Sequence, residues 1–207
     1  TTMQIPHPSY AGIYDSDVSR ATARESFGID DDEYAVLFLG QVRPYKGIDV
    51  LLEAIAHMRR DDGRKPVLLL AGAASPEAIA QFEDLKPPSV RAITHFSTVP
   101  DGEIARWYRA ADIAVFPYRA ILNSGSMHLA ATMEIPAVLP DLPHLREQFN
   151  SEPWVGFFDV TNAVESLALV LSSDALVPPN APAFSQFTKE ISPWQISTKY
   201  HALLNSL

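Results

Sequence analysis

The stretch Tyr34-Ala35-Val36-Leu37-Phe38-Leu39-Gly40-Gln41-Val42-Arg43-Pro44-Tyr45-Lys46-Gly47 joins an apolar run to a short polar turn. The run at 34–39 is preceded by acidic residues and followed by glycine, which predicts a buried strand. Beyond the turn, apolar side chains at helical spacing predict an amphipathic helix over 47–60, namely Ile48, Leu51, Leu52, Ile55 and Met58. This order of strand, turn and helix is typical of a parallel α/β sheet.

Two cations, Arg43 and Lys46, stand in this turn beside the amino end of the predicted helix. A helix amino end presents unpaired backbone N–H groups and a partial positive charge. Two side-chain cations added to it make a favourable seat for a phosphate or diphosphate group. The alternative is that both are solvated loop charges, and the turn alone does not decide between these interpretations.

Strand-like runs alternate with helical patterns along most of the chain. Apolar runs predict strands at 34–39, 67–71, 90–94, 113–116, 137–139 and 155–158. Amphipathic patterns predict helices near 47–60, 76–85, 102–111, 125–134, 142–149 and 161–173. The alternation predicts an α/β fold: a Rossmann-like parallel sheet of about six strands flanked by helices. Gly40, Gly72, Phe96 and Tyr118 each follow a predicted strand, so we expect them along the carboxyl edge, where such sheets bind ligands.

A second candidate anion site follows the predicted strand at 113–116. Asn123-Ser124-Gly125-Ser126 opens the next helix, and Gly125 would let the backbone approach a ligand closely. The hydroxyl groups of Ser124 and Ser126 and the free N–H groups could bind phosphate oxygens. The alternative is a plain serine cap on the helix. Both anion candidates lie on the same expected edge, which favours a shared anion.

Composition excludes several classes of protein. The 207 residues are 47% hydrophobic and 20% charged, which is typical of a globular domain, and the net charge of -9 argues against nucleic-acid binding. The chain has no cysteine for disulfides or thiolate metal sites, and no apolar run long enough to span a bilayer. Its six histidines lack the spacing of a zinc helix, and G-x-S-x-G, P-loop and G-x-G-x-x-G motifs are absent.

The carboxy-terminal part has a different composition. Val177-Pro178-Pro179-Asn180-Ala181-Pro182 is typical of a stiff linker. An amphipathic helix is predicted from Pro193, with Ser192 as its cap. We therefore expect a Rossmann-like domain at 1–177, and at 178–207 a linker and a terminal helix that packs back or toward another domain. An entry strand at 3–5 and a short helix at 18–27 would precede the sheet.

Residues 40–54 fit the pattern G-x-x-R-x-Y-K-G-x-x-x-L-L-x-A, which resembles the donor-domain signature of GT-B glycosyltransferases close to glycosyltransferase family 4 (group 1). The run at 101–117 is similar to the acidic, tyrosine-containing helix and strand of that family. Residues 136–138 resemble its following P-V strand, and 192–194 the start of its closing helix. The likeness extends over about residues 3–207 and implies the carboxy-terminal, donor-binding half of a GT-B enzyme.

The resemblance implies roles for residues of both candidate sites. Arg43 and Lys46 would neutralise the donor diphosphate as it departs, and would be the catalytic residues. The diphosphate contacts would also include Gly40, Gln41, Ser124, Gly125 and Ser126. The nucleoside and sugar would meet Phe96, Val99, Tyr118 and Asn123. No metal and no cofactor beyond the nucleoside-diphosphate sugar would be needed.

Four positions depart from the family pattern. Gln41 stands where an arginine usually follows the strand glycine, and Arg43 would replace it. The two glutamates of the family's E-x7-E motif fall on Ile121 and Leu129, which leaves ribose recognition, sugar identity and stereochemistry open. Glu134 occupies the position of a usual glycine.

The expected function is therefore transfer of a hexose from a nucleoside-diphosphate sugar to a saccharide or lipid-linked acceptor, in cytoplasmic polysaccharide or glycoconjugate synthesis. The expected partners are the nucleotide sugar and an N-terminal acceptor domain outside this chain, through which the enzyme could associate peripherally with a membrane; no nucleic acid is expected. Without that domain we expect no activity. One alternative is a degenerate, non-catalytic donor-like domain that binds a protein. Another is a sugar-nucleotide epimerase of similar two-domain fold.

Overall fold

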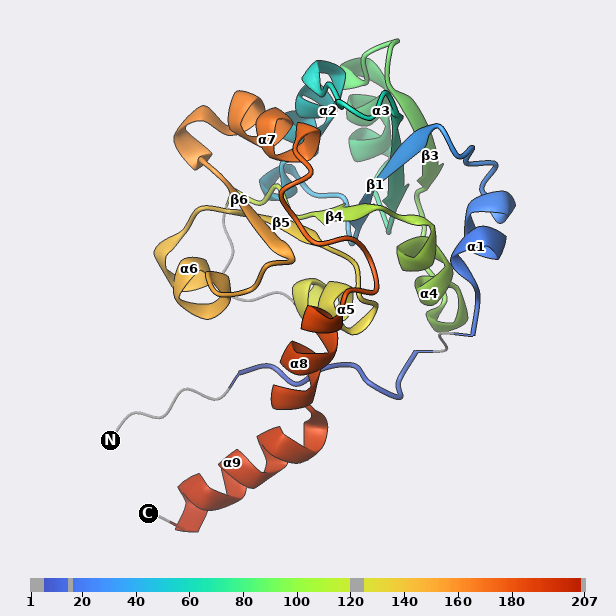
Figure 1. Ribbon diagram of the computed structural model, residues 1–207. Coiled ribbons are helices and arrows are strands. Elements are labelled where there is room, and N and C mark those ends of the chain that lie inside the picture. Colours follow the sequence, from blue (N-terminus) through green and yellow to red (C-terminus); the bar gives the residue numbers. More distant parts are fainter. Residues whose placement is uncertain (1–5, 15–16, 120–124, 206–207) are drawn as a thin grey trace.

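The computed structural model describes residues 6–14, 17–119 and 125–205. Six parallel strands form one sheet in the order β3-β2-β1-β4-β5-β6 (Figure 1). The strands are β1 (Glu33–Leu39), β2 (Lys65–Ala71), β3 (Arg91–His95), β4 (Ile113–Val115), β5 (Ala137–Pro140) and β6 (Val155–Phe158). The predicted α/β fold is confirmed.

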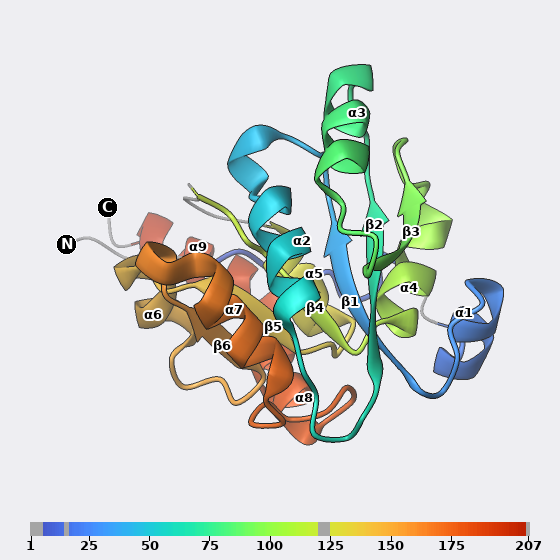
Figure 2. The same cartoon turned by 90° about the horizontal axis from the view of Figure 1, so that it is seen from above.

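Helices cover both faces of this sheet. They are α1 (Arg20–Ser26), α2 (Ile48–His57), α3 (Pro76–Leu85), α4 (Asp101–Ala110), α5 (Gly125–Thr132), α6 (Pro143–Phe149), α7 (Ala163–Ser172), α8 (Pro182–Glu190) and α9 (Pro193–Asn205), with short 3-10 turns η1 (Pro44–Lys46) and η2 (Val160–Asn162). On one face α2 packs between α3 and α7, and on the other α4 packs with α1 (Figures 1 and 2). Because the central strands are covered on both faces, residues 67–71 of β2 are all buried and their sequence is continuously apolar.

The strand order switches direction at β1 and β4, which lie side by side in the sheet. From β1 the chain runs outward to β2 and β3, and then returns to place β4 on the other side of β1. In open parallel sheets, ligands bind in the crevice at the carboxyl ends of such a strand pair. The carboxyl edge of β1 and β4 is therefore the expected ligand-binding edge of this sheet.

An arginine cluster fastens the opposite, amino-terminal edge. The buried Asp112 carboxylate accepts hydrogen bonds from Arg20 at 2.8 Å, Arg24 at 3.1 Å and Arg64 at 2.8 Å. It also accepts from the backbone N–H of Ala35 in β1 at 2.7 Å. This carboxylate thus ties α1 and the start of β2 to the start of β4.

Glu134, in the connection from α5 to β5, has a left-handed backbone, at φ 57. Its own N–H donates to Ala131 and the N–H of Ile135 donates to Ala130, so the turn caps the last carbonyl groups of α5. Glycine is favoured in such a conformation. The family pattern's glycine at this position therefore has a backbone reason, and Glu134 is under strain.

The carboxy-terminal region contains a helix that the sequence did not predict. Residues expected to continue a linker form α8, which buries Phe184 and Phe187 against Trp154. The predicted terminal helix is present as α9, which projects away from the sheet (Figure 1) with Trp194, Tyr200 and Leu204 exposed. The expected entry strand at 3–5 lies outside the described residues. Among the helices that the structure describes, none combines the length and apolar character needed to cross a bilayer.

Candidate functional site

A five-residue segment at 43–47, here called the cation turn, joins β1 to α2. Arg43 is extended, Pro44–Lys46 forms η1, and Gly47 is left-handed at φ 68. A Cβ atom on Gly47 would collide with the carbonyl oxygen of Pro117. The turn therefore lies directly on the chain that leaves β4, and only glycine fits at its end.

Lys46 is held over an aromatic ring at this junction. Its ammonium nitrogen lies 3.7 Å from the centre of the Tyr118 ring and 5.4 Å from that of Tyr45. Burial lowers the pKa of Lys46 below its ordinary 10.5, and the neighbouring charge of Arg43 lowers it further. Within the described ranges neither Arg43 nor Lys46 forms an ion pair. An anion placed here would relieve both effects.

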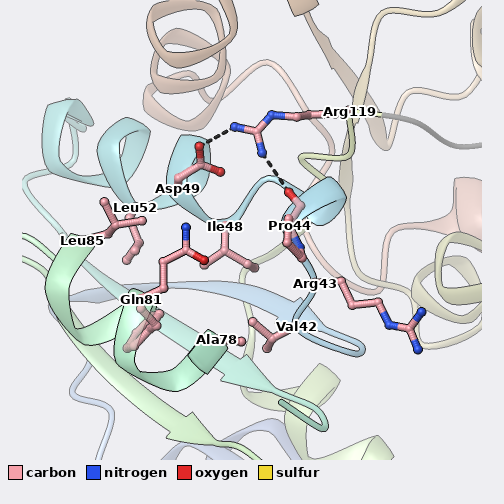
Figure 3. A pocket seen from close by; sticks show the side chains of 11 residues that line it. Val42, Arg43, Pro44, Ile48, Asp49, Leu52, Ala78, Gln81, Leu85 and Arg119 are labelled. Carbon is pink, nitrogen blue, oxygen red and sulfur yellow. Dashed lines mark hydrogen bonds and ion pairs between the residues drawn. The ribbon is translucent and has the colours of Figure 1, made fainter. Parts of the chain in front are cut away.

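The cation turn is also fastened by Arg119. The Arg119 backbone N–H donates to the Tyr45 carbonyl at 2.9 Å, and its guanidinium donates to the Pro44 carbonyl at 2.8 Å. The same guanidinium pairs with the Asp49 carboxylate in the first turn of α2 (Figure 3). The structure thus adds two residues, Arg119 and Asp49, that sequence reasoning missed.

The glycines that follow β1 and β2 bring the strand ends together. Gly40 donates its N–H to Ala71 at 2.8 Å, and Gly72 donates to His95 at 2.9 Å. A Cβ on Gly72 would collide with the carbonyl of Gly40. Beyond this contact Gln41 is exposed. Gly40, Gly72 and Tyr118 share the carboxyl edge, as predicted, and Phe96 directly follows β3 on the same edge.

The second anion candidate is described only in part, because Asn123 and Ser124 lie outside the described residues. Gly125 begins α5 and packs against the Tyr10 hydroxyl, where a Cβ would collide. The carbonyl of Ser126 accepts a hydrogen bond from the Tyr108 hydroxyl at 3.2 Å. Burial raises the pKa of Tyr108, and the nearby Tyr118 adds to the shift. Tyr108 thus binds the first turn of α5 and lies near Tyr118, the ring beneath Lys46.

The residues predicted to meet the nucleoside differ in exposure. Phe96 and Val99 are half-buried in the connection from β3 to α4, and the Phe96 ring packs edge-on against Phe82 at 5.3 Å. Tyr118 is only 2% exposed, beneath Lys46. The structure therefore places Tyr118 as support for the cation, with little of its own surface available.

A hollow lies between α2 and α3, next to the cation turn. Its walls are mostly apolar side chains, and its lining residues include Val42, Ile48, Leu52, Phe82 and Leu85. The Arg119–Asp49 pair lies at one end, while the Arg43 guanidinium points away from that pair (Figure 3). Among the described residues there is no cluster of three or more His, Cys, Asp or Glu side chains that could hold a metal ion.

Residues 33–173 match the family model described as glycosyl transferases group 1. The chain belongs to this glycosyltransferase family. A D-inositol 3-phosphate glycosyltransferase of Streptomyces bingchenggensis is 34% identical over 106 residues, which cover 47% of this chain and 23% of that protein. A GDP-mannose:glycolipid 4-beta-D-mannosyltransferase of Xanthomonas campestris is 29% identical over 105 residues, covering 51% of this chain and 30% of that protein.

This glycosyltransferase chain also has the fold of one half of a GT-B enzyme. The crystal structure of Anabaena HepE in complex with UDP and glucose superposes with a TM-score of 0.72 at 17% sequence identity. The superposition covers 93% of this chain and 53% of HepE. The chain thus spans about half the length of that structure, and its curated relatives are matched over about a quarter of theirs. The predicted family and fold are confirmed.

Proposed function

We propose that this chain binds the diphosphate of a nucleotide sugar and serves as the donor half of a hexosyltransferase. The observation that carries the proposal is the pair Arg43 and Lys46 on one turn at the carboxyl edge, with the pKa of Lys46 lowered by burial and by Arg43. A bound diphosphate would supply the missing negative charge. Charge-assisted hydrogen bonds of this kind are about twice as strong as neutral ones.

The proposed chemistry is stabilisation of a leaving group. When the bond between the sugar carbon and the diphosphate oxygen breaks, negative charge grows on the diphosphate. Arg43 and Lys46 would stabilise that charge more strongly as it develops, which lowers the barrier. Lys46 suits this role because the ring of Tyr118 fixes its ammonium group at 3.7 Å.

The other predicted contacts complete the proposed donor site. Backbone groups of Gly40 and Gln41, and of Ser124, Gly125 and Ser126 at the start of α5, would add hydrogen bonds to the phosphates. Phe96, Val99 and Asn123 would contact the nucleoside and sugar, while Tyr118 would act through Lys46. With two side-chain cations at the phosphates, we expect the donor to bind without a metal ion.

The acceptor would bind to a second, amino-terminal domain. The proposal is supported by the extent of the likeness to HepE, of which this chain covers 53%, and by the GT-B arrangement of two facing domains. Names of relatives include an inositol phosphate and a glycolipid as acceptors, and a saccharide or lipid-linked acceptor is our proposal for this protein. Cytoplasmic synthesis of a surface polysaccharide or glycoconjugate, with peripheral membrane association through the other domain, belongs to the same proposal.

A thermal-shift panel of uridine, guanosine and adenosine diphosphates and their sugar conjugates tests the proposed donor binding. A ligand at 100 times its dissociation constant should stabilise the fold by about 2.7 kcal/mol. One base should dominate the panel, and inorganic sulfate at the same ionic strength should give a much smaller shift. A melting temperature unchanged by every nucleotide would overturn the proposal. We expect no transfer by this chain alone.

The second candidate function is a non-catalytic module that binds a protein. The three exposed apolar side chains on α9, Trp194, Tyr200 and Leu204, favour it, as does Leu129, which is buried at the position of a family glutamate. This module would self-associate or bind a partner protein, and it would not bind nucleotides. Sedimentation of a monomer that binds a nucleoside diphosphate would reject it.

A further inference from the structure

We propose that Arg119 is a positioning residue that holds the cation turn in the geometry needed to bind a diphosphate. The inference rests on the proposed donor-binding function. Arg119 need not touch the donor in this account: it acts through Arg43 and Lys46. The partner that completes the fastening is Asp49.

The hydrogen bonds of Arg119 converge on the two residues between these cations. Its backbone N–H donates to the Tyr45 carbonyl and its guanidinium donates to the Pro44 carbonyl, at 2.9 and 2.8 Å. The guanidinium also reaches Asp49 in the first turn of α2. The Arg119 side chain therefore joins η1 to the following helix, and its backbone joins η1 to the chain that leaves β4.

Tyr118 and Arg119 both contact the cation turn. The Tyr118 ring supports Lys46, while the guanidinium of its neighbour Arg119 reaches the Pro44 carbonyl. Gly47 lies against Pro117 closely enough to exclude a Cβ atom. Three consecutive residues after β4 thus form the surface on which the cation turn rests.

Arg119 does not act as a third phosphate cation in this arrangement. Its guanidinium points toward Asp49, whereas that of Arg43 points the other way (Figure 3). The Arg119 and Asp49 side chains are 50% and 41% exposed, and ion pairs at such sites contribute little to global stability. Ligand binding depends more strongly than stability on the loss of this pair, because a small displacement of Arg43 and Lys46 sharply weakens their interaction with a phosphate.

Arg91 offers a matched control. It too donates to a carboxylate, that of Glu33, and to a backbone carbonyl, that of Gly28, and it is 44% exposed. It lies at the start of β3, at the opposite edge of the sheet. Arg119→Ala and Arg91→Ala therefore remove the same kinds of hydrogen bonds from arginines of similar exposure. The carboxylate that Arg91→Ala leaves behind is the more buried, at 9% for Glu33 against 41% for Asp49, so Arg91→Ala is the more severe change.

Calorimetric titration with the preferred nucleoside diphosphate and with the matching nucleoside tests the inference. Arg119→Ala should weaken diphosphate binding by roughly tenfold and leave nucleoside binding unchanged, while Arg91→Ala should change neither. Arg119→Lys keeps the charge but loses the guanidinium, which donates to Pro44 and Asp49 together. Its diphosphate affinity should therefore be close to that of Arg119→Ala. Wild-type affinity in Arg119→Ala, or full rescue by Arg119→Lys, would overturn the positioning role.

Hydrogen exchange separates this inference from the proposed function. The amides of Lys46 and Gly47 donate within the turn, to Arg43 and Pro44. Arg119→Ala and Asp49→Asn should accelerate exchange at these amides, with or without nucleotide. If the wild-type chain bound no diphosphate, the proposed function would fail. Unchanged exchange in both variants would refute the fastening by Arg119 itself.

Discussion

The ammonium nitrogen of Lys46 lies 3.7 Å from the centre of the Tyr118 ring, and this contact joins the turn after β1 to the chain after β4. Cation–π contacts contribute about 0.5–2 kcal/mol, more when desolvated. Here the contact also fixes a lysine whose pKa is lowered by burial and by Arg43. The charged form of Lys46 is therefore disfavoured in the free chain, and a bound anion would stabilise it.

The lowered pKa of Lys46 predicts proton-linked binding. A bound diphosphate should raise this pKa, so the complex holds more protons than the free chain, and affinity should fall as pH rises from neutrality toward 10.5. Lys46→Arg should bind with an affinity that is flat over this range, because arginine stays charged. Calorimetry in buffers of different ionisation enthalpy measures the proton uptake. A wild-type affinity as flat as that of Lys46→Arg would contradict this linkage.

Gly47→Ala should destabilise the fold by about 1–3 kcal/mol from its left-handed backbone, with a further cost from the collision with Pro117. Gly63→Ala is the control, because Gly63 has a similar φ of 75 but open space around it. Urea denaturation should show a larger loss for Gly47→Ala than for Gly63→Ala, and only Gly47→Ala should weaken nucleotide binding. Equal losses would mean that the contact with Pro117 is unimportant.

Asp112→Asn should be strongly destabilising. The substitution leaves Arg20, Arg24 and Arg64 facing a neutral amide, and breaking a buried pair costs about 3–5 kcal/mol. Asp174→Asn removes an exposed partner of Arg60 and should cost less than about 1 kcal/mol. Chemical denaturation of both variants compares them. Similar midpoints would show that the arginine cluster does not carry the stability assigned to it.

Glu134→Gly should stabilise the protein. A left-handed residue other than glycine costs about 1–2 kcal/mol, and the extra freedom of unfolded glycine takes back about 0.4–1 kcal/mol. The net gain is about 0.5–1 kcal/mol, visible as a higher melting temperature. Glu53→Gly, in the middle of α2, should instead lose about 1 kcal/mol. A lower melting temperature for Glu134→Gly would show that the backbone there is relaxed.

The regular elements could be predicted because each apolar run has one clear period and a defined end. The six strands fall within about two residues of their expected bounds. Helix α8 was missed because Pro178, Pro179 and Pro182 are typical of a linker, although Phe184, Phe187 and Ile191 follow helical spacing. That helical spacing was the feature of the sequence from which α8 could have been predicted.

The sequence was enough to predict the two cations of the site, but not the residues that hold them in place. Arg43 and Lys46 stand close together in the sequence, within a recognisable turn. Arg119 and Asp49 are 70 residues apart, and only the sheet order brings them together. The burial of Tyr118 under Lys46 has the same origin, since β4 lies beside β1 only after the crossover from β3. Asn123 and Ser124 lie outside the described residues, and their roles stay predictions.

The most direct test is the affinity that the phosphates add. Calorimetry gives the difference in binding free energy between the preferred nucleoside diphosphate and its nucleoside. At about 1.5–3 kcal/mol per charged hydrogen bond, Arg43 and Lys46 should make the diphosphate at least tenfold tighter in the wild-type chain. That advantage in affinity should shrink at least tenfold in the double variant Arg43→Ala/Lys46→Ala, which keeps only the backbone contacts to the phosphates. It should persist in Lys65→Ala/Arg91→Ala, which changes the net charge equally at the opposite edge of the sheet. An undiminished phosphate contribution in Arg43→Ala/Lys46→Ala would contradict the account.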